Sequence, residues 1–520
     1  MLHEIHSTSR DIPQRERLAF YAGILYSKAM MNILKCTVAN VWTTLDDWPD
    51  EAIAIADEAL SPTVPNAHHI YRVHEQQHGP RYNNKKCPIC KFGWDLKRHF
   101  ITSARNVPTG LLVDLGSAMA LEGYHLDLRD NRKKPSGSPW GHSITLREDQ
   151  ERVVGQFLEV NRGYLQAATA FGKTIVDIVL AARLGVPTLM IVPTKALVSN
   201  HAKKIEELCE ADLNVWSGPP PWRIGDINIS TQALLSAHSR GLNKHTSDID
   251  FLVVDEAHHV TAKTWYKTVM QIDAYYRLGQ SALAFGDSDL SDMQLRAAIG
   301  PVFADVSGAE MTEDGRLEDT TVYFIHSHFW GGKLEDPYRQ GIVENNVRNA
   351  YIREINQACR ELEVQCLTLV AWKQHLDLLV AALNEKGVDR LDEVYGQGMT
   401  TKQMNERLDR LQSGETLCCI STTVFDEGID VPDLPVLVMG GAHKRDRRTI
   451  QRLGRVRRKG AWEKAAVFDF WDDADKQLEE HARERAQQYL DQGCVVEHIM
   501  VPIQKIGEVV QEFFERGAAT

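Results

Sequence analysis

The run from Ala167 to Thr174 reads Ala-Ala-Thr-Ala-Phe-Gly-Lys-Thr, and it limits the possible folds of this chain more than any other segment. Strand-like residues 164–166 precede it, and a helical pattern from Ile175 to Ala182 follows it. The sequence therefore predicts a strand, a tight loop and a helix in direct succession. Backbone N–H groups at the start of such a helix bind anions, and the helix dipole adds to the attraction.

The spacing within this loop predicts a phosphate site. Lys173 would reach the β- and γ-phosphates of a nucleotide, and the Thr174 hydroxyl would bind Mg²⁺. The remaining residues that we expect around the nucleotide are Thr169, Ala170, Phe171 and Gly172. Ala170 stands where many phosphate loops have glycine, so its backbone must avoid positive φ or be strained.

A second acidic segment follows about eighty residues later. The short apolar run 251–254 predicts a buried strand, and Asp255-Glu256-Ala257-His258 comes directly after it. Asp255 can hold Mg²⁺, and Glu256 can orient the attacking water. Together the loop and the acidic segment predict a nucleotide triphosphatase that uses ATP and Mg²⁺.

Composition excludes several classes of protein. Of 520 residues, 43% are hydrophobic and 25% are charged, which is typical of globular domains. The net charge of −12 argues against coating nucleic acid by bulk charge, although it permits a local basic track. The nine cysteines indicate reduced thiols. With neither a secretion signal nor an apolar run of membrane length, we expect a cytoplasmic protein of a bacterial or phage-infected cell, with no membrane partner.

The chain divides into four predicted regions. Residues 131–141 are rich in turn formers and basic residues, which indicates a linker. Apolar strand-like runs alternate with helical patterns on both sides of about residue 315, which predicts two α/β domains with mostly parallel sheets. The predicted boundaries are an N-terminal accessory domain at 1–140, α/β domains at 141–315 and 316–490, and a C-terminal extension at 491–520.

Five further motifs occur in a fixed order around these segments. They are Leu146–Gln150, Pro193–Leu197, Ser230–Gln232, Ser421–Asp430 and Gln451–Arg458. In this order the chain resembles the superfamily 2 helicases with a DEAH-type box, over roughly residues 142–475. Within them it looks most like the branch-migrating helicases of tailed phages and the related DNA-repair helicases. The resemblance implies two tandem RecA-like domains and a nucleic-acid-dependent ATPase.

The resemblance also implies roles in the ATP site. Gln150 would read the adenine edge with Arg147 close to the base, and His258 would complete the catalytic acidic segment. Arginine suits the far side of the nucleotide, because its fork stays charged and can stabilise the γ-phosphoryl transition state. The implied residues of the second domain are Gly428 and Asp430 near the nucleotide, and Gln451, Arg455 and Arg458 as catalytic groups.

A separate set would hold one nucleic-acid strand, through hydroxyls and backbone amides that contact phosphates. By the resemblance, these residues are Pro193, Thr194, Ser230 and Thr231 in the first domain and Thr422 in the second. The implied partner is forked, branched or single-stranded DNA, and RNA is less favoured.

One motif departs from the family pattern. The usual Ser/Thr-Ala-Thr occurs here as Ser281-Ala282-Leu283, and Leu283 lacks the hydroxyl. The prediction is an ATP-dependent helicase or translocase that remodels forked or branched DNA. The alternatives are an ATP-hydrolysing binding switch or annealing protein that does not unwind, and an RNA helicase.

The accessory domain lies outside the resemblance. Cys87 and Cys90 have the spacing of a zinc site, and His74 and His78 would share a helix face and supply two more ligands. Basic residues surround the cysteines, so we predict a Zn²⁺-stapled module that grips DNA phosphates. The same stretch contains His-Glu-x-x-His, but Gly79-Pro80 would end that helix at once, which disfavours a metallopeptidase.

Overall fold

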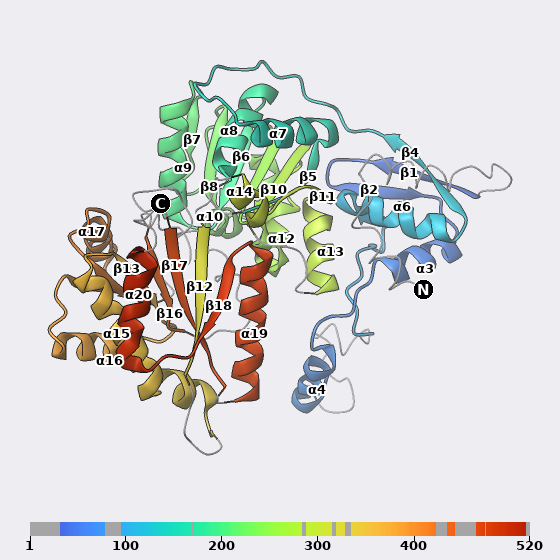
Figure 1. Cartoon of the computed structure of the whole chain (residues 1–520). Coiled ribbons are helices and arrows are strands. Elements are labelled where there is room, and N and C mark those ends of the chain that lie inside the picture. The colour runs from blue at the N-terminus through green and yellow to red at the C-terminus, as the bar shows by residue number, and fades with distance from the viewer. Residues whose placement is uncertain are drawn as a thin grey trace. The chain divides into compact units, whose positions relative to one another are not determined.

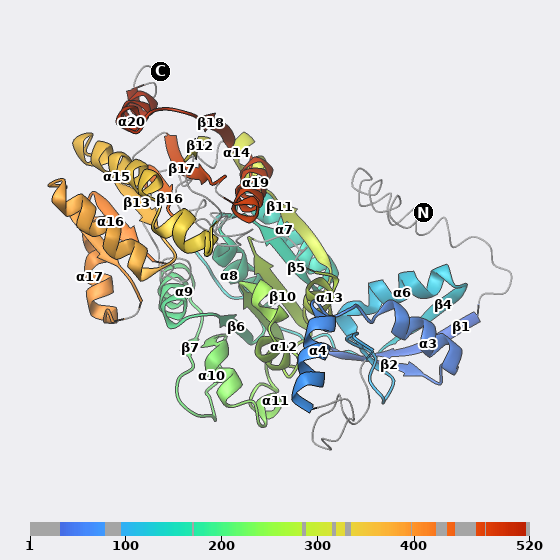
Figure 2. The same cartoon turned by 90° about the horizontal axis from the view of Figure 1, so that it is seen from below.

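The computed structural model describes residues 32–78, 95–168, 171–282, 288–314, 319–327, 334–396, 398–422, 434–441, 464–473 and 475–515. The chain divides into two compact units. The first contains Met1–Lys133 with Ser288–Met293, and the second contains Lys134–Asp287 with Gln294–Thr520. Figure 1 and Figure 2 show the elements that make up these units in two views. Among the described residues, no helix combines the length and apolar character that a membrane span requires.

The N-terminal unit contains a four-stranded sheet of order β3-β2-β1-β4, counted over its described residues. Strand β1 pairs antiparallel with β2 and parallel with β4. Leu34, Cys36 and Val38 alternate along β1 and are buried. The elements are β1 (Asn32–Val38), β2 (Trp42–Asp46), α3 (Asp50–Ala59), α4 (Ala67–His78), β3 (Asn106–Pro108), η1 (Thr109–Leu111), α6 (Leu112–Leu121) and β4 (Tyr124–Asp130).

The stretch before His68, whose residues 52–60 have the helical spacing that α3 adopts, also contains strands. Strands β1 and β2 lie there, and their apolar residues alternate with polar ones as a half-buried sheet requires. Residues 131–141, the predicted linker, have no regular secondary structure. This segment lies alongside the C-terminal end of α8. Ser138 N–H donates to Gly185 O at 3.2 Å, and Trp140 N–H donates to Ala182 O at 3.2 Å.

The second unit begins with an α/β domain whose seven described strands are all parallel, in the order β11-β5-β10-β9-β6-β8-β7. Its elements are α7 (Glu148–Val160), β5 (Arg162–Ala167), α8 (Lys173–Leu184), β6 (Thr188–Val192), α9 (Lys195–Leu208), β7 (Leu213–Val215), β8 (Ile227–Thr231), α10 (Gln232–Ala237), α11 (Leu242–His245), β9 (Phe251–Asp255), η2 (Ala257–Thr261), α12 (Lys263–Val269), β10 (Tyr276–Ser281), α13 (Asp289–Ala298), β11 (Val302–Val306) and α14 (Gly308–Glu313).

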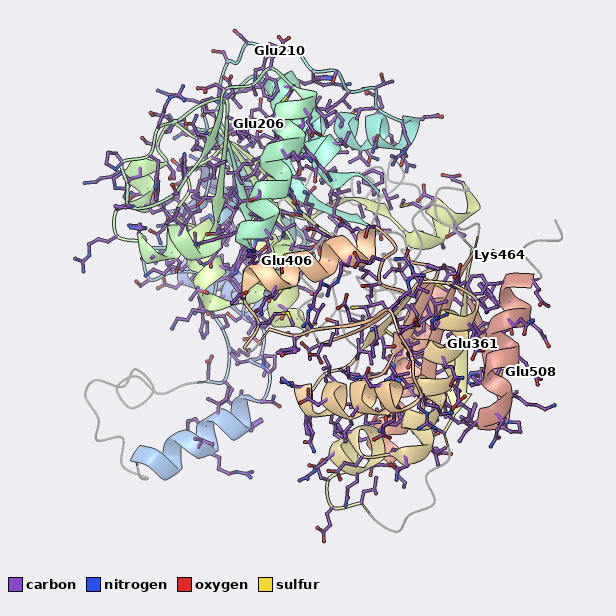
Figure 3. The ribbon with its side chains drawn as sticks, turned by 90° about the vertical axis from the view of Figure 1, so that its left-hand side faces the viewer. Glu206, Glu210, Glu361, Glu406, Lys464 and Glu508 are labelled. Atoms are coloured by element: carbon purple, nitrogen blue, oxygen red, sulfur yellow. The ribbon has the colours of Figure 1, made fainter. Side chains whose placement is uncertain are left out.

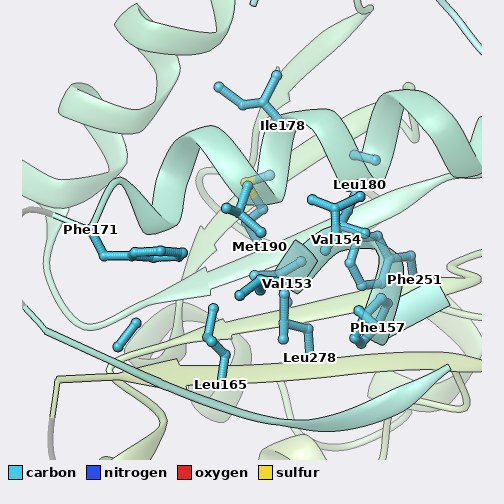
Figure 4. Close-up of a cluster of buried hydrophobic side chains, with 14 of the residues drawn as sticks. Val153, Val154, Phe157, Leu165, Phe171, Ile178, Leu180, Met190, Phe251 and Leu278 are labelled. Carbon is cyan, nitrogen blue, oxygen red and sulfur yellow. The ribbon is translucent and has the colours of Figure 1, made fainter. Parts of the chain in front are cut away.

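Successive residues of these strands face opposite layers of helices. Phe251 and Val253 pack with α7 and α8 on one face, whereas Leu252 and Val254 pack with α10 and α12 on the other. Figure 4 shows the first of these clusters, with Phe171 of the phosphate loop within it. A parallel sheet covered on both faces requires such continuously apolar strands.

A second α/β domain follows, again with seven described parallel strands, in the order β14-β15-β13-β16-β17-β12-β18. The prediction of two tandem RecA-like domains is thereby confirmed. Its elements are β12 (Asp319–His326), η3 (Arg339–Val343), α15 (Asn346–Glu361), β13 (Cys366–Leu369), α16 (Lys373–Glu385), β14 (Leu391–Val394), α17 (Thr401–Gln412), β15 (Cys418–Ser421), β16 (Val436–Met439), β17 (Lys464–Trp471), α19 (Lys476–Asp491), β18 (Val495–Ile499), η5 (Ile503–Lys505) and α20 (Ile506–Glu515).

Residues 495–515 are integrated with this second domain. Strand β18 pairs with β12, and Ile506, Val510 and Phe513 of α20 are buried in the same core as α15 and α16. Buried ion pairs also lie in the interior of this domain. Arg348 Nε lies 2.9 Å from Asp472 Oδ1, and Arg485 Nε lies 2.9 Å from Asp469 Oδ2. Removing one partner of such a pair typically costs about 3–5 kcal/mol, because the other charge stays buried.

Candidate functional site

The carboxyl ends of five neighbouring strands form one edge of the first α/β sheet. Strands β5, β10, β9, β6 and β8 lie next to one another in that order, and all run in the same direction. The residues at or just beyond this edge are the phosphate loop after Ala167, Ser281, Asp255, Pro193 with Thr194, and Thr231. Ligands bind at this edge of open parallel sheets.

The described part of the phosphate loop is shaped by Gly172. Its φ of +90° lies in the left-handed region, and a Cβ atom there would meet Gln150 Nε2 at 2.6 Å. The preceding carbonyl, Phe171 O, accepts hydrogen bonds from Arg147 Nη2 at 2.7 Å and Gln150 Nε2 at 2.9 Å. Arg147 and Gln150, both expected at the base, therefore lie against the loop. Thr169 and Ala170 lie outside the described residues.

Lys173 is the first residue of α8, and its side chain turns back over the loop. Its Nζ donates to Ala167 O at 3.1 Å and to Ala168 O at 3.5 Å. Both acceptors are neutral carbonyls at the end of β5. The ammonium group is therefore held at the anion-binding end of α8, where a phosphate could replace the carbonyls as its partner.

Thr174 and Asp255, the two predicted Mg²⁺ ligands, both contact His201. His201 Nε2 lies 3.4 Å from Thr174 Oγ1 and 3.5 Å from Asp255 Oδ2. A hydroxyl and a carboxylate supply the hard oxygen donors that Mg²⁺ prefers. The two donors share a common neighbour, so the residues present fit a Mg²⁺ ion that also binds substrate phosphates.

A buried acidic network lies beneath these ligands. Gln280 Nε2 donates to Asp177 Oδ2 at 2.6 Å and lies 3.4 Å from Asp255 Oδ1. Burial, and then the charge of Asp255, raises the pKa of Asp177 well above its usual range. Burial also raises the pKa of Asp255, although His201 and Lys173 oppose that shift. Among the described residues, Asp177 Oδ1 and Gln280 Oε1 are buried without a hydrogen-bond partner.

Glu256 has the opposite electrostatic character. Burial disfavours its charge, but the hydrogen bond with His258, the Lys173 ammonium and the Ser281 hydroxyl together lower its pKa to about 2. Its backbone has φ 47° and ψ 48°, a conformation that few residues other than glycine adopt. Strained backbone of this kind clusters at functional sites. Glu256 is therefore a carboxylate at neutral pH and can accept a hydrogen bond from water.

His258 completes this group at the end of β9. Its Nδ1 lies 3.3 Å from Glu256 Oε2 and 2.9 Å from Ser281 Oγ. Its ring also contacts that of His259, with centroids 4.2 Å apart and the ring planes tilted by 37°. His258 contacts protein groups on each of these sides, so the geometry favours a role in orienting Glu256.

The predicted strand-binding residues lie at helix starts on the same edge. Thr194 and Thr231 are the N-caps of α9 and α10, and their Oγ1 atoms accept from Leu197 N and Leu234 N, both at 3.3 Å. Ser230 is fully buried, and its hydroxyl donates to Thr231 O at 3.2 Å. The strand-binding roles remain predictions, and Ser230 would contribute through its backbone position.

Of the residues expected in the second domain, Thr422 is described. It is buried after β15, and its N–H donates to Val394 O at 3.0 Å. The predicted nucleotide and arginine residues of this domain all lie outside the described residues; they are Gly428, Asp430, Gln451, Arg455 and Arg458.

The side chains of all four predicted zinc ligands lie outside those that the structure describes. Helix α4 ends at His78, where Gly79-Pro80 was expected to stop it. His74 and His78 lie on this helix, whereas Cys87 and Cys90 lie beyond the described residues. Over the parts of the chain that are described, no group of three or more His, Cys, Asp or Glu residues could hold a metal. The zinc site therefore remains a prediction.

Sequence reasoning missed three residues of the site: His201, Asp177 and Gln280. Asp177 lies one turn after Lys173 on α8, and Gln280 directly precedes Ser281. A charged or amide residue at an otherwise apolar position of a helix or strand was the available signal. His201 is polar where its helix neighbours Val198 and Ile205 are buried and apolar.

The site and the two parallel sheets define a class of protein, an ATPase with a phosphate loop and a second domain of the same fold. Residues 143–285 match the family described as type III restriction enzyme, res subunit. Residues 348–460 match the helicase conserved C-terminal domain.

Similar proteins agree with these matches. The chain is 24% identical over 355 residues to "DNA 3'-5' translocase XPB2" of Sulfurisphaera tokodaii, which covers 61% of this chain and 79% of the relative. It is 23% identical over 331 residues to "Probable helicase D10" of Escherichia phage T5, covering 60% and 68% of the two chains. The structure of S. cerevisiae Dbp5 bound to RNA and ADP BeF3 shares the fold, with a TM-score of 0.53 at 15% identity, over 73% of this chain and 93% of that chain.

The two family matches and the named relatives support a superfamily 2 helicase near the phage and DNA-repair groups, and with it an ATPase of the helicase class.

Proposed function

We propose that this protein is an ATP-dependent DNA helicase or translocase that unwinds or remodels forked and branched DNA. One observation carries the proposal. The phosphate loop, Asp255 and the helix starts at Thr194 and Thr231 share one edge of a single sheet. The relative named as a DNA translocase favours DNA over RNA.

In the proposed reaction, water attacks the γ-phosphorus, the bond to the bridging oxygen of ADP breaks, and ADP, phosphate and a proton leave. Glu256 orients the water, since its carboxylate is ionised and held by Ser281 and His258. Lys173 exchanges its carbonyl partners for phosphate oxygens. Thr174 and Asp255 would hold Mg²⁺, which neutralises charge on the phosphates when bound.

The second domain supplies the transition-state contacts in this proposal. Gln451, Arg455 and Arg458 approach the γ-phosphate, and Gly428 and Asp430 lie near the nucleotide. Thr422 and the helix starts at Thr194 and Thr231 grip one strand of DNA through its phosphates. ATP hydrolysis then changes how tightly one domain binds the strand relative to the other domain, and this difference moves the strand.

The accessory domain would hold DNA independently of ATP. We propose that His74, His78, Cys87 and Cys90 bind one Zn²⁺ and so fold the basic stretch around the cysteines. Lys and Arg residues there would contact phosphates, which gives salt-sensitive binding with little sequence preference.

The deciding experiment compares strand displacement with ATP hydrolysis on the same nucleic acid. A forked DNA duplex, a linear duplex and the matching RNA fork are tested with the full chain under single-turnover conditions. ATP-dependent displacement on forked DNA supports the proposal. ATP hydrolysis without strand displacement would instead support a binding switch or annealing protein. The replacement of the family's hydroxyl residue by Leu283 is the reason to measure this outcome. Displacement of RNA alone would indicate an RNA helicase.

A further inference from the structure

His201 is a buried histidine that the expected helicase motifs do not include. It lies on α9, two turns after the helix begins, and only 5% of its surface is exposed. Its Nε2 is within 3.5 Å of both Thr174 Oγ1 and Asp255 Oδ2, the side chains that would hold Mg²⁺. These two residues come from different elements, α8 and the end of β9, and His201 contacts both.

The hydrogen bonds of the ring fix how it can act. Nδ1 lies 2.9 Å from Leu197 O, and because a carbonyl only accepts, Nδ1 carries the proton. In the neutral ring, Nε2 accepts from the Thr174 hydroxyl; in the charged ring, it donates to the Asp255 carboxylate. In either form the imidazole ties a metal-binding side chain to the backbone of α9. Residues that hydrogen-bond to the ligands of a metal commonly influence the affinity for that metal.

Helix α9 also carries the predicted strand contact. Its N-cap is Thr194, seven residues before His201, which corresponds to about 10 Å along a helix. The opposite face of α9 is exposed, and Glu206 lies on it (Figure 3). The helix therefore has its start at the strand-binding edge, one charged face in solvent, and His201 directed at the metal-binding pair.

We propose that His201 is a positioning residue that aligns Thr174 and Asp255 for Mg²⁺ and couples them, through α9, to a DNA strand bound at Thr194. This inference rests on the proposed function, since it takes the ATP site and the strand site as given. It adds a direct mechanical link between them within one domain. Strand binding at the start of α9 would then strengthen metal–nucleotide binding.

The test uses Mn²⁺ as a paramagnetic probe for the Mg²⁺ site. Mn²⁺ is titrated into the full chain with a non-hydrolysable ATP analogue, with and without single-stranded DNA, and free Mn²⁺ is followed by electron paramagnetic resonance. The variants are His201→Leu, which removes both ring nitrogens, and His201→Gln, whose amide can replace Nε2. His238→Leu is the matched control. His238 makes the same Nδ1 contact with a carbonyl four residues earlier, Leu234 O at 3.0 Å, at a site without predicted metal ligands.

Wild-type protein and His238→Leu should bind Mn²⁺ more tightly when DNA is present. His201→Leu should bind Mn²⁺ about tenfold more weakly, because replacing a residue that contacts metal ligands typically lowers metal affinity by this much. It should also lose the effect of DNA on Mn²⁺ binding. His201→Gln should recover most of both. Nucleotide binding in EDTA and DNA binding without nucleotide should stay at wild-type values in every variant.

Three results would overturn the inference. The first is that His201→Leu binds Mn²⁺ as tightly as the wild type and keeps the effect of DNA. The second is that His238→Leu loses as much Mn²⁺ affinity as His201→Leu does. The third is that His201→Leu binds nucleotide more weakly in EDTA, which would show a merely structural role. Wild-type protein that binds neither Mn²⁺–nucleotide nor DNA would overturn the proposed function itself, a separate and distinguishable outcome.

Discussion

Ser281 Oγ donates a hydrogen bond to Glu256 Oε2 across 3.0 Å, from the end of β10 to the end of β9. The same hydroxyl lies 2.9 Å from His258 Nδ1. Although the segment departs from the family pattern at Leu283, its first residue thus still joins two residues of the acidic segment. The retained hydroxyl therefore helps His258 and Lys173 to keep Glu256 ionised and contributes to the orientation of its carboxylate.

Glu256→Gln should lower ATP turnover by about 100-fold or more, while ATP and DNA still bind together. Glutamine keeps the size of the side chain but cannot accept as a carboxylate does. A filter-binding assay and a phosphate-release assay on the same preparation measure both effects. Glu206→Gln, on the exposed face of α9, is the control and should hydrolyse ATP as the wild type does. Unchanged hydrolysis in Glu256→Gln would contradict a catalytic role.

Lys173→Ala should abolish DNA-stimulated ATP turnover, with a loss of about 100-fold or more, and leave DNA binding nearly intact. The ammonium lies 3.1 Å from Ala167 O, at the helix start where phosphate would bind. DNA contacts are expected from other residues. Lys203→Ala removes an exposed lysine from α9, 3.9 Å from Glu207, and serves as the control. Turnover retained at more than a small fraction would refute the assignment.

Arg455→Ala and Arg458→Ala should each lower turnover by roughly 1,000-fold and ATP affinity far less. A contact made mainly in the transition state is lost from kcat and not from ground-state binding. The measurement compares kcat with the dissociation constant of an ATP analogue. Arg483→Ala, an exposed arginine paired with Glu479, is the control. Equal losses in rate and affinity would show that these arginines only bind nucleotide or DNA.

Acid should destabilise the second α/β domain through His375. Burial, followed by the charge of Arg348, lowers the pKa of His375 to about 3. The unfolded chain therefore binds a proton below about pH 6.5 that the folded chain binds only below about pH 3. Stability falls as the pH drops through this window, by at most about 1.4 kcal/mol per pH unit. Urea unfolding of the full chain at several pH values should show a shallower pH dependence in His375→Gln, and an identical slope would contradict this.

The sequence predicted the strands and loops of the ATP site better than the strands of the accessory domain. The apolar run 251–254 predicted β9, because this strand is buried along its whole length and the acidic segment follows it directly. The strands of the accessory domain were missed, since β1 and β2 are short and half-exposed. The contacts of His201 could not be predicted, because they depend on where the sheet order brings β9 and α8 relative to α9.

The last prediction concerns the accessory domain. The full chain should contain about one Zn²⁺, because Cys87 and Cys90 have the spacing of zinc ligands and His74 and His78 are one helical turn apart on α4. Cys87→Ser should lose the metal and bind DNA more weakly, with ATP affinity unchanged. Since the lost contacts are mainly to phosphates, the difference from wild type should shrink as salt rises.

Elemental analysis and DNA titrations at two salt concentrations measure these effects. Cys209→Ser, at a half-buried cysteine of the first α/β domain, should keep both the metal and the affinity. Protein without zinc that retains full DNA-dependent activity would mean that Cys87 and Cys90 are free thiols. The two α/β domains would then have to account for the DNA binding.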